Sequence, residues 1–70
     1  MEMELIIELE REDDGRWIAE VPALPGVVAY GDSEADAVRA VQALALHTLA
    51  DRVEHGELVL AAPITFAAAA

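Results

Sequence analysis

The chain has 70 residues, enough for one small domain and too few for a second core. Its 14 Asp and Glu residues outnumber 4 Lys and Arg, which gives a formal net charge of −10. This charge argues against direct binding to nucleic acid or to an anionic membrane, because both require clustered cations. It is compatible with a basic protein partner. Cysteine is absent, which excludes disulfides and thiolate metal ligands and is typical of a cytoplasmic protein.

The apolar fraction of 56% is too high for a disordered chain. No apolar run reaches the roughly 18 residues that a membrane-spanning helix needs. A domain of this size buries only about 60% of its unfolded surface, so its stability alone is marginal. Without a disulfide or a recognisable metal site, self-association is the expected source of further stability. We therefore predict one domain over residues 1–70 that forms a homo-oligomer, a dimer or a tetramer.

The N-terminal segment predicts a β-hairpin. Its apolar residues alternate with acidic ones, which is typical of a strand with one buried and one solvated face. The apolar side chains are Met3, Leu5, Ile7 and Leu9, and the acidic ones are Glu2, Glu4, Glu8 and Glu10. Asp14 and Gly15 form a strong turn pair before a second strand at residues 16–21. In that strand Trp17, Ala19 and Val21 share a face, and the short connection makes the pair antiparallel.

A connector, a strand and a helix are predicted next. Pro22 and Pro25 make residues 22–26 a rigid segment outside any strand, and residues 27–30 predict a short third strand. Apolar residues recur at helical spacing over residues 35–53. The predicted buried stripe consists of Val38, Val41, Ala45, Thr48 or Leu49, and Arg52 or Val53, and it is widened by Ala37, Leu44 and Leu46. Ser33 is placed to cap the start of this helix, and Gly56 to end it.

The C-terminal part predicts one more strand, at residues 58–60 or 63–66, where Pro63 restricts it to an edge or a strand start. Residues 67–70 are expected to form a frayed tail. The predicted fold class is therefore α+β with the order β-β-β-α-β: a three-stranded antiparallel sheet packed on one long helix, with a short C-terminal strand.

Candidate partner contacts come from acidic and aromatic side chains. Carboxylates are concentrated near the predicted hairpin turn, and aromatic residues are common anchors in protein interfaces. The candidate contacts are Glu8, Glu10, Glu12, Asp13, Asp14, Trp17 and Tyr30. The alternative interpretations are a solvated strand face and hairpin tip for the carboxylates, and core positions for Trp17 and Tyr30.

Catalytic and metal-binding patterns are weak. His47 and His55 are too far apart on a helix to bind one metal ion together, and the acidic cluster lacks the spacing of a calcium loop. Ser33 is explained by helix capping, and the four glycines stand singly, without a phosphate-binding loop. We expect no catalytic residues, no metal site and no cofactor.

One stretch resembles a known family. Residues 14–27 read DGRWIAEVPALPGV, and residues 29–37 read AYGDSEADA. Together they resemble the HicB family of antitoxins, marked by the string D-G-x-[YW]-x-A-x-x-P-x-L-P-G and a following small helix entry. The match covers the second predicted strand through the first turns of the helix, and the element order fits nearly the whole chain.

The resemblance implies a truncated ribonuclease-H-like fold without ribonuclease activity. It also implies an antitoxin of a type II toxin-antitoxin system, which binds and blocks a small basic HicA-type toxin, a ribonuclease that cuts mRNA. Many members of the family carry a C-terminal DNA-binding segment. Here only an apolar tail follows Gly56, so we expect no direct contact of this chain with nucleic acid.

Two other interpretations remain open. One is a stand-alone homo-oligomeric HicB-like binding domain without a toxin partner. The other is a metal-dependent nuclease on a ribonuclease-H-like scaffold. The nuclease would need Glu8 and Glu10 of the first strand to converge with Asp51 and Glu54 of the helix.

Overall fold

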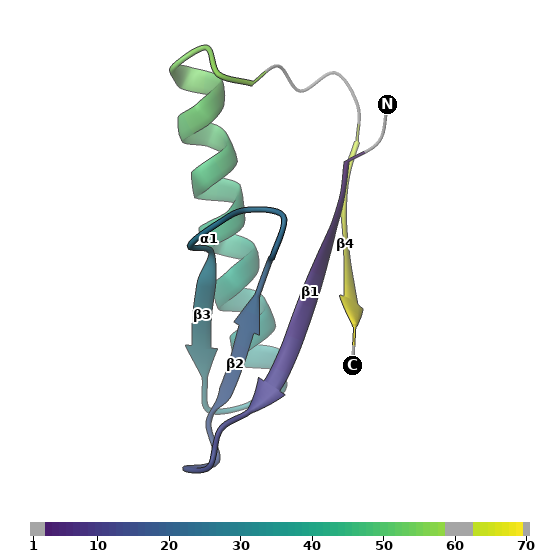
Figure 1. Cartoon of the computed structure of the whole chain (residues 1–70), viewed down its shortest axis with the longest axis vertical. Coiled ribbons are helices and arrows are strands. Elements are labelled where there is room, and N and C mark those ends of the chain that lie inside the picture. The colour runs from purple at the N-terminus through teal and green to yellow at the C-terminus, as the bar shows by residue number, and fades with distance from the viewer. Residues whose placement is uncertain (1–2, 59–62, 70) are drawn as a thin grey trace.

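The computed structural model of the chain describes residues 3–58 and 63–69. It forms an α+β domain with the element order β1 (Met3–Arg11), β2 (Trp17–Glu20), β3 (Val28–Gly31), α1 (Glu34–Glu54) and β4 (Ile64–Ala69). The strands make one mixed sheet in the order β3-β2-β1-β4. Figure 1 shows α1 behind β2 and β3, with β1 and β4 extending to one side of it.

The antiparallel part of the sheet is the predicted hairpin with a third strand added. β1 pairs with β2 and β2 with β3, both antiparallel. Gly15 has a φ of +92° in the hairpin turn, a backbone conformation that glycine adopts without strain. The predicted turn and antiparallel pairing are therefore confirmed.

The C-terminal strand differs from the expectation. β4 pairs in parallel with β1 from Met3 opposite Ile64 to Glu8 opposite Ala69. The expectation of a frayed tail is therefore wrong for residues 67–69, because their backbone continues the ladder with β1. Val59 and Leu60 of the alternative strand, Glu2 of the first predicted strand and Ala70 of the tail lie outside the described residues.

The predicted caps enclose α1. Ser33 has extended backbone angles, and its Oγ accepts a hydrogen bond from the Asp36 N–H at 3.1 Å. At the other end Gly56, with a φ of +72°, donates to the Val53 carbonyl, and Glu57 donates to the Arg52 carbonyl. These two bonds form a Schellman motif, which satisfies carbonyls that the last turn leaves without partners.

The core lies between α1 and one face of the sheet. The helix buries Ala37, Val41, Ala45 and Leu49, one residue per turn. This stripe differs from the predicted one, because Val38 is only partly buried, and Leu44 and Leu46, expected to widen the stripe, are exposed. The sheet and the connector contribute Leu5, Ile7, Ala19, Val21, Leu24 and Val27. The connector thus folds Leu24 inward, and the opposite face of the sheet has no helix over it in the described part of the chain (Figure 1).

Candidate partner-binding surface

The sheet face turned away from α1, here called the outer face, carries acidic side chains. Leu5 and Ile7 of β1 are buried toward the helix, so the residues between and beyond them point the other way. The strand register extends this face across the sheet. It comprises Glu4, Ile6, Glu8 and Glu10 of β1, Ile18 and Glu20 of β2, Val28 and Tyr30 of β3, and Thr65, Ala67 and Ala69 of β4.

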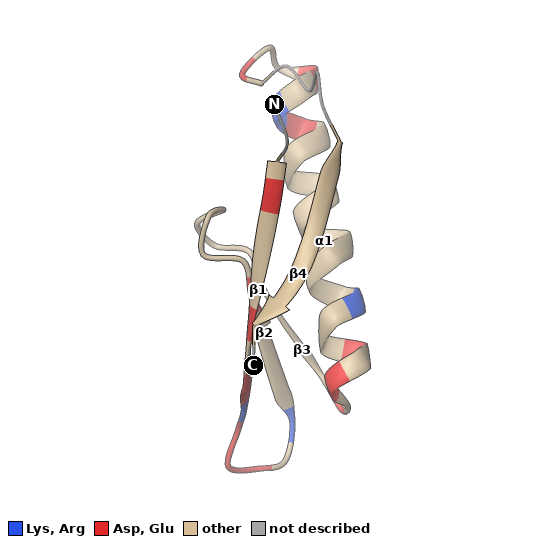
Figure 2. Ribbon diagram, turned by 90° about the vertical axis from the view of Figure 1, so that its right-hand side faces the viewer, with Lys and Arg blue, Asp and Glu red and all other residues tan. Residues whose placement is uncertain are grey.

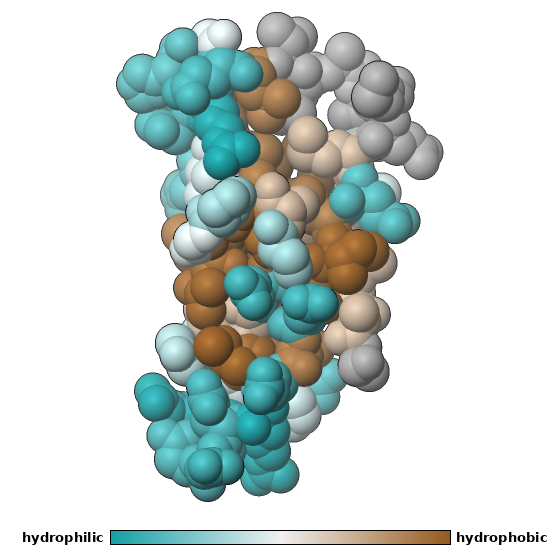
Figure 3. All heavy atoms as spheres, viewed as in Figure 1, coloured by the Kyte–Doolittle hydropathy of each residue, from teal (hydrophilic) through white to brown (hydrophobic). Residues whose placement is uncertain are grey.

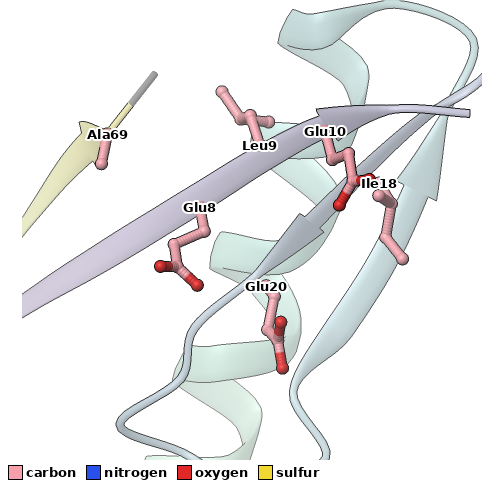
Figure 4. Close-up of a pocket in the computed structure, with 6 residues that line it drawn as sticks. All are labelled: Glu8, Leu9, Glu10, Ile18, Glu20 and Ala69. Atoms are coloured by element: carbon pink, nitrogen blue, oxygen red, sulfur yellow. The ribbon is translucent and has the colours of Figure 1, made fainter.

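The centre of the outer face brings like charges together. Glu8 lies directly opposite Glu20 in the β1–β2 ladder, and Glu10 lies opposite Ile18. Like charges in facing positions of neighbouring strands repel each other. Together with Leu9 and Ala69, these residues line a hollow of about 320 Å³. Figure 4 shows the side chains of Glu8, Glu10, Ile18 and Glu20 projecting to one side of the sheet, whereas the Leu9 side chain projects to the other. The middle of the outer face is therefore an acidic depression with an apolar side.

Tyr30 and Arg16 border this depression. Ile18 lies opposite Tyr30 in the β2–β3 ladder, and the Tyr30 side chain is 49% exposed. The Arg16 guanidinium carbon lies 5.0 Å from the centre of the Tyr30 ring, within the range of a cation–π contact. An aromatic surface thus adjoins the carboxylates, as is common in protein interfaces.

The hairpin turn adds a second group of carboxylates. Glu12, Asp13 and Asp14 occupy the turn, which is closed by bonds from Gly15 N–H to Glu12 O and from Glu12 N–H to Arg16 O. Asp14 accepts hydrogen bonds from the Arg16 backbone N–H at 3.0 Å and from its Nε–H at 2.8 Å. These two bonds lower the pKa of Asp14 below 3.8. Figure 2 shows that acidic residues dominate this turn.

The structure brings most of the predicted contacts to one side of the molecule. Glu8, Glu10 and Tyr30 share the outer face, and the acidic turn follows directly at the end of β1. Trp17 does not join them. It shares the inner face with Ala19, where it is half-buried and packs against the core. This position favours the interpretation of Trp17 as a core residue.

Glu20 and Ile18, which lie opposite Glu8 and Glu10 on the outer face, were not among the contacts predicted from the sequence. Glu20 and Ile18 alternate with Trp17 and Ala19 in β2, so the sequence pattern already placed them on the solvated face. Their position beside Glu8 and Glu10 follows only from the hairpin register. The position of the Asp14-Gly15 turn is the sequence signal for this pairing, because residues counted outward from the turn in both directions face each other in a hairpin.

The structure does not assemble the residues that a metal-dependent nuclease would need. Glu8 and Glu10 lie on the outer face, whereas α1, which carries Asp51 and Glu54, packs against the inner one. Across residues 3–58 and 63–69, His, Asp and Glu side chains form no group of three or more that is suited to hold a metal ion. His55 lies at the helix end, where its Nδ1 is 2.7 Å from the Asp51 carbonyl oxygen.

The chain was compared with known protein families, curated proteins and solved structures. No protein family, curated protein or solved structure matches this chain. Among the described residues, no helix is both long enough and apolar enough to cross a membrane.

Proposed function

We propose that this chain is a binding protein without a reaction of its own, and that it covers the basic surface of a protein partner with its acidic outer face and hairpin turn. More specifically, we propose a cytoplasmic antitoxin of the HicB type that neutralises a small basic HicA-type mRNA ribonuclease by occlusion. The observation that carries the proposal is the gathering of Glu8, Glu10 and Glu20 on one uncovered sheet face beside Ile18 and Tyr30.

Electrostatics supports a basic partner. Glu8 and Glu20 face each other although neighbouring strands usually pair opposite or neutral residues in such positions. Arg16, the cation that borders this depression, is held by Asp14 and Tyr30. Cationic side chains of a partner would relieve the repulsion between the carboxylates and would be steered toward the face by the net charge of −10.

The fold supports the resemblance to the HicB family. The element order β-β-β-α-β with β4 added beside β1 is compatible with the truncated ribonuclease-H-like fold that the resemblance implies. The family string also corresponds to distinct structural parts in this chain: the turn at Gly15, the strand β2, the connector with buried Leu24, and the cap at Ser33.

The proposal is tested by binding and inhibition. HicA-type ribonucleases, beginning with any small basic protein encoded next to this chain, are titrated with it while mRNA cleavage is followed. We expect stoichiometric inhibition and an affinity that falls as salt is raised, because the contacts are between opposite charges. A variant with Glu8→Gln, Glu10→Gln and Glu20→Gln should bind at least about tenfold more weakly.

The control variant removes the same charge elsewhere. Glu34→Gln, Glu54→Gln and Glu57→Gln change exposed residues at the two ends of α1, away from the outer face. Equal weakening by both triple variants would mean that only net charge matters and would contradict a defined interface. Full ribonuclease activity at saturating amounts of the chain would reject the antitoxin function.

A further inference from the structure

The free edge of β4 is unusual for an acidic protein. β4 borders β1 on one side only, and in Figures 1 and 2 it forms the margin of the described sheet. Its sequence, ITFAAA, contains no charged residue and no proline. Natural edge strands are usually protected by charges, prolines, bulges or short length. β4 has six residues, whereas β3 at the opposite edge has only four.

The register shows which backbone groups face the open side. Met3 pairs with Ile64, and the Met3 N–H donates to the Pro63 carbonyl at 3.1 Å. In a parallel ladder the N–H and C=O of one residue point to the same side, and those of the next residue point to the other. Pro63, Thr65, Ala67 and Ala69 therefore face β1. Ile64, Phe66 and Ala68 direct their backbone groups to the open edge.

We propose that this edge pairs with β4 of a second copy of the chain, antiparallel and centred on Phe66. In that register Phe66 faces the Phe66 of the second copy, and Ile64 faces Ala68 in both directions. All these residues present open N–H and C=O groups, so each facing pair exchanges both of its hydrogen bonds. Pairing about a two-fold axis uses the same surface on both copies and closes as a dimer.

The side chains on β4 suit this arrangement. Ile64, Phe66 and Ala68 share the face of Met3, Leu5 and Ile7, and Ile64 and Phe66 are only half-buried in the single chain. Self-pairing places an aromatic side chain opposite an aromatic one and a large side chain opposite a small one. Both combinations favour cross-strand packing. The dimer would bury apolar surface that one copy leaves accessible to water.

The distribution of charge allows a second copy to pair with the β4 edge, although each copy has a net charge of −10. β4 brings no carboxylate to the contact, whereas β1 carries Glu4, Glu8 and Glu10. In the paired sheet the two β1 strands are separated by three strand spacings, about 14 Å. This exceeds the Debye length of about 8 Å at physiological salt, so repulsion between the copies is largely screened.

Sedimentation of the full chain at several protein and salt concentrations tests this proposal. We expect a monomer–dimer equilibrium that shifts toward dimer as salt is raised. Binding of a basic partner has the opposite salt dependence, so failure of one proposal is distinguishable from failure of the other. Ala68→Pro removes a donor at the open edge without removing a bond to β1, and it should raise the dimer dissociation constant by about tenfold or more.

A second pair of variants keeps the test decisive if the proline unfolds the chain. Ala68→Glu puts a carboxylate opposite Ile64 of the other copy, and Ala50→Glu adds the same charge at an exposed position of α1. Only Ala68→Glu should disrupt the dimer, with the far-ultraviolet circular dichroism unchanged. A chain that is monomeric at every salt and protein concentration would overturn the proposal, as would a dimer that Ala68→Glu leaves intact.

Discussion

Gly31 is a residue at which β3 and the start of α1 approach each other closely. A Cβ at this position would lie 2.3 Å from the Ala37 backbone nitrogen and 2.7 Å from the Asp36 carbonyl carbon. Neither backbone atom is able to rotate away as a side chain would. We predict that Gly31→Ala lowers the free energy of unfolding by about 3 kcal/mol, because the start of α1 must shift away from β3. Urea unfolding followed by the fluorescence of Trp17 measures this loss.

Gly26→Ala provides the matched control for Gly31→Ala. Gly26 has a φ of +84°, and a methyl group added there would extend into open space, so alanine meets conformational strain but no clash. Its expected cost is about 1 kcal/mol. Similar losses for the two variants would show that the approach of β3 to α1 is not tight.

Asp14 gives a prediction for pH. Its pKa is lowered by the backbone N–H of Arg16 first and by the Arg16 side chain second. A lowered carboxyl pKa stabilises the fold above the unfolded pKa of about 3.8, and this stabilisation is lost as the pH falls through the folded value. An NMR titration should place the Asp14 midpoint below 3.8. In Arg16→Gln the midpoint should rise only part of the way, because the backbone donor remains; an unchanged midpoint would exclude a side-chain contribution.

At the scale of elements, the β1–β2 ladder contains a pair that opposes stability. Glu8 faces Glu20 on the outer face, where a residue of opposite charge would be favourable. We predict that Glu20→Lys raises the free energy of unfolding by about 0.5–1 kcal/mol at low salt, and that the gain shrinks as salt is added. The same substitution should weaken binding of a basic partner. Urea titrations at low and high salt measure the first effect.

Glu57→Lys separates the local effect from the change in net charge. Glu57 is exposed in the turn after α1 and changes charge by the same amount without a cross-strand neighbour. If Glu57→Lys stabilised the chain as much as Glu20→Lys, the repulsion would belong to the whole molecule rather than to the ladder.

Elements with strong local signals were predictable from the sequence. The alternation in β1, the turn glycine at position 15, and the caps at Ser33 and Gly56 act within a few residues and appear in the structure as expected. β4 was only partly predictable. Alanines 67–69 show no alternation, and their strand conformation depends on pairing with β1, which is about 60 residues away in the sequence.

The candidate partner-binding surface, like the fold, was only partly predictable from the sequence. Alternation within β1 placed Glu8 and Glu10 on one face without any knowledge of the fold. The contributions of Glu20 and Ile18, and the location of Trp17 on the opposite face, depend on the strand register and on which face α1 covers. The register could be counted back from the Asp14-Gly15 turn, whereas the face that α1 covers is a property of the assembled domain.

The whole molecule combines a small core with a large uncompensated charge. The core consists of aliphatic side chains with no buried polar group among the described residues, and three of these side chains, Ala19, Ala37 and Ala45, are single methyl groups. On the face shown in Figure 3, hydrophobic surface in the middle surrounds a few hydrophilic residues, and hydrophilic residues gather at the lower end and near the upper end of α1. Stability in such a domain rests on apolar burial, while mutual repulsion of the carboxylates opposes the compact state.

This balance predicts that salt stabilises the folded single chain. Raising NaCl from about 0.02 M to about 0.5 M shortens the Debye length several-fold and should increase the free energy of unfolding by about 1 kcal/mol. Urea is the suitable denaturant because it is uncharged, and Ala68→Glu keeps the chain monomeric for the measurement. The variant with Glu8→Gln, Glu10→Gln and Glu20→Gln should respond less, because it has lost the facing carboxylates of the β1–β2 ladder. An equal response of the two proteins would mean that salt acts through apolar burial and not through the acidic outer face.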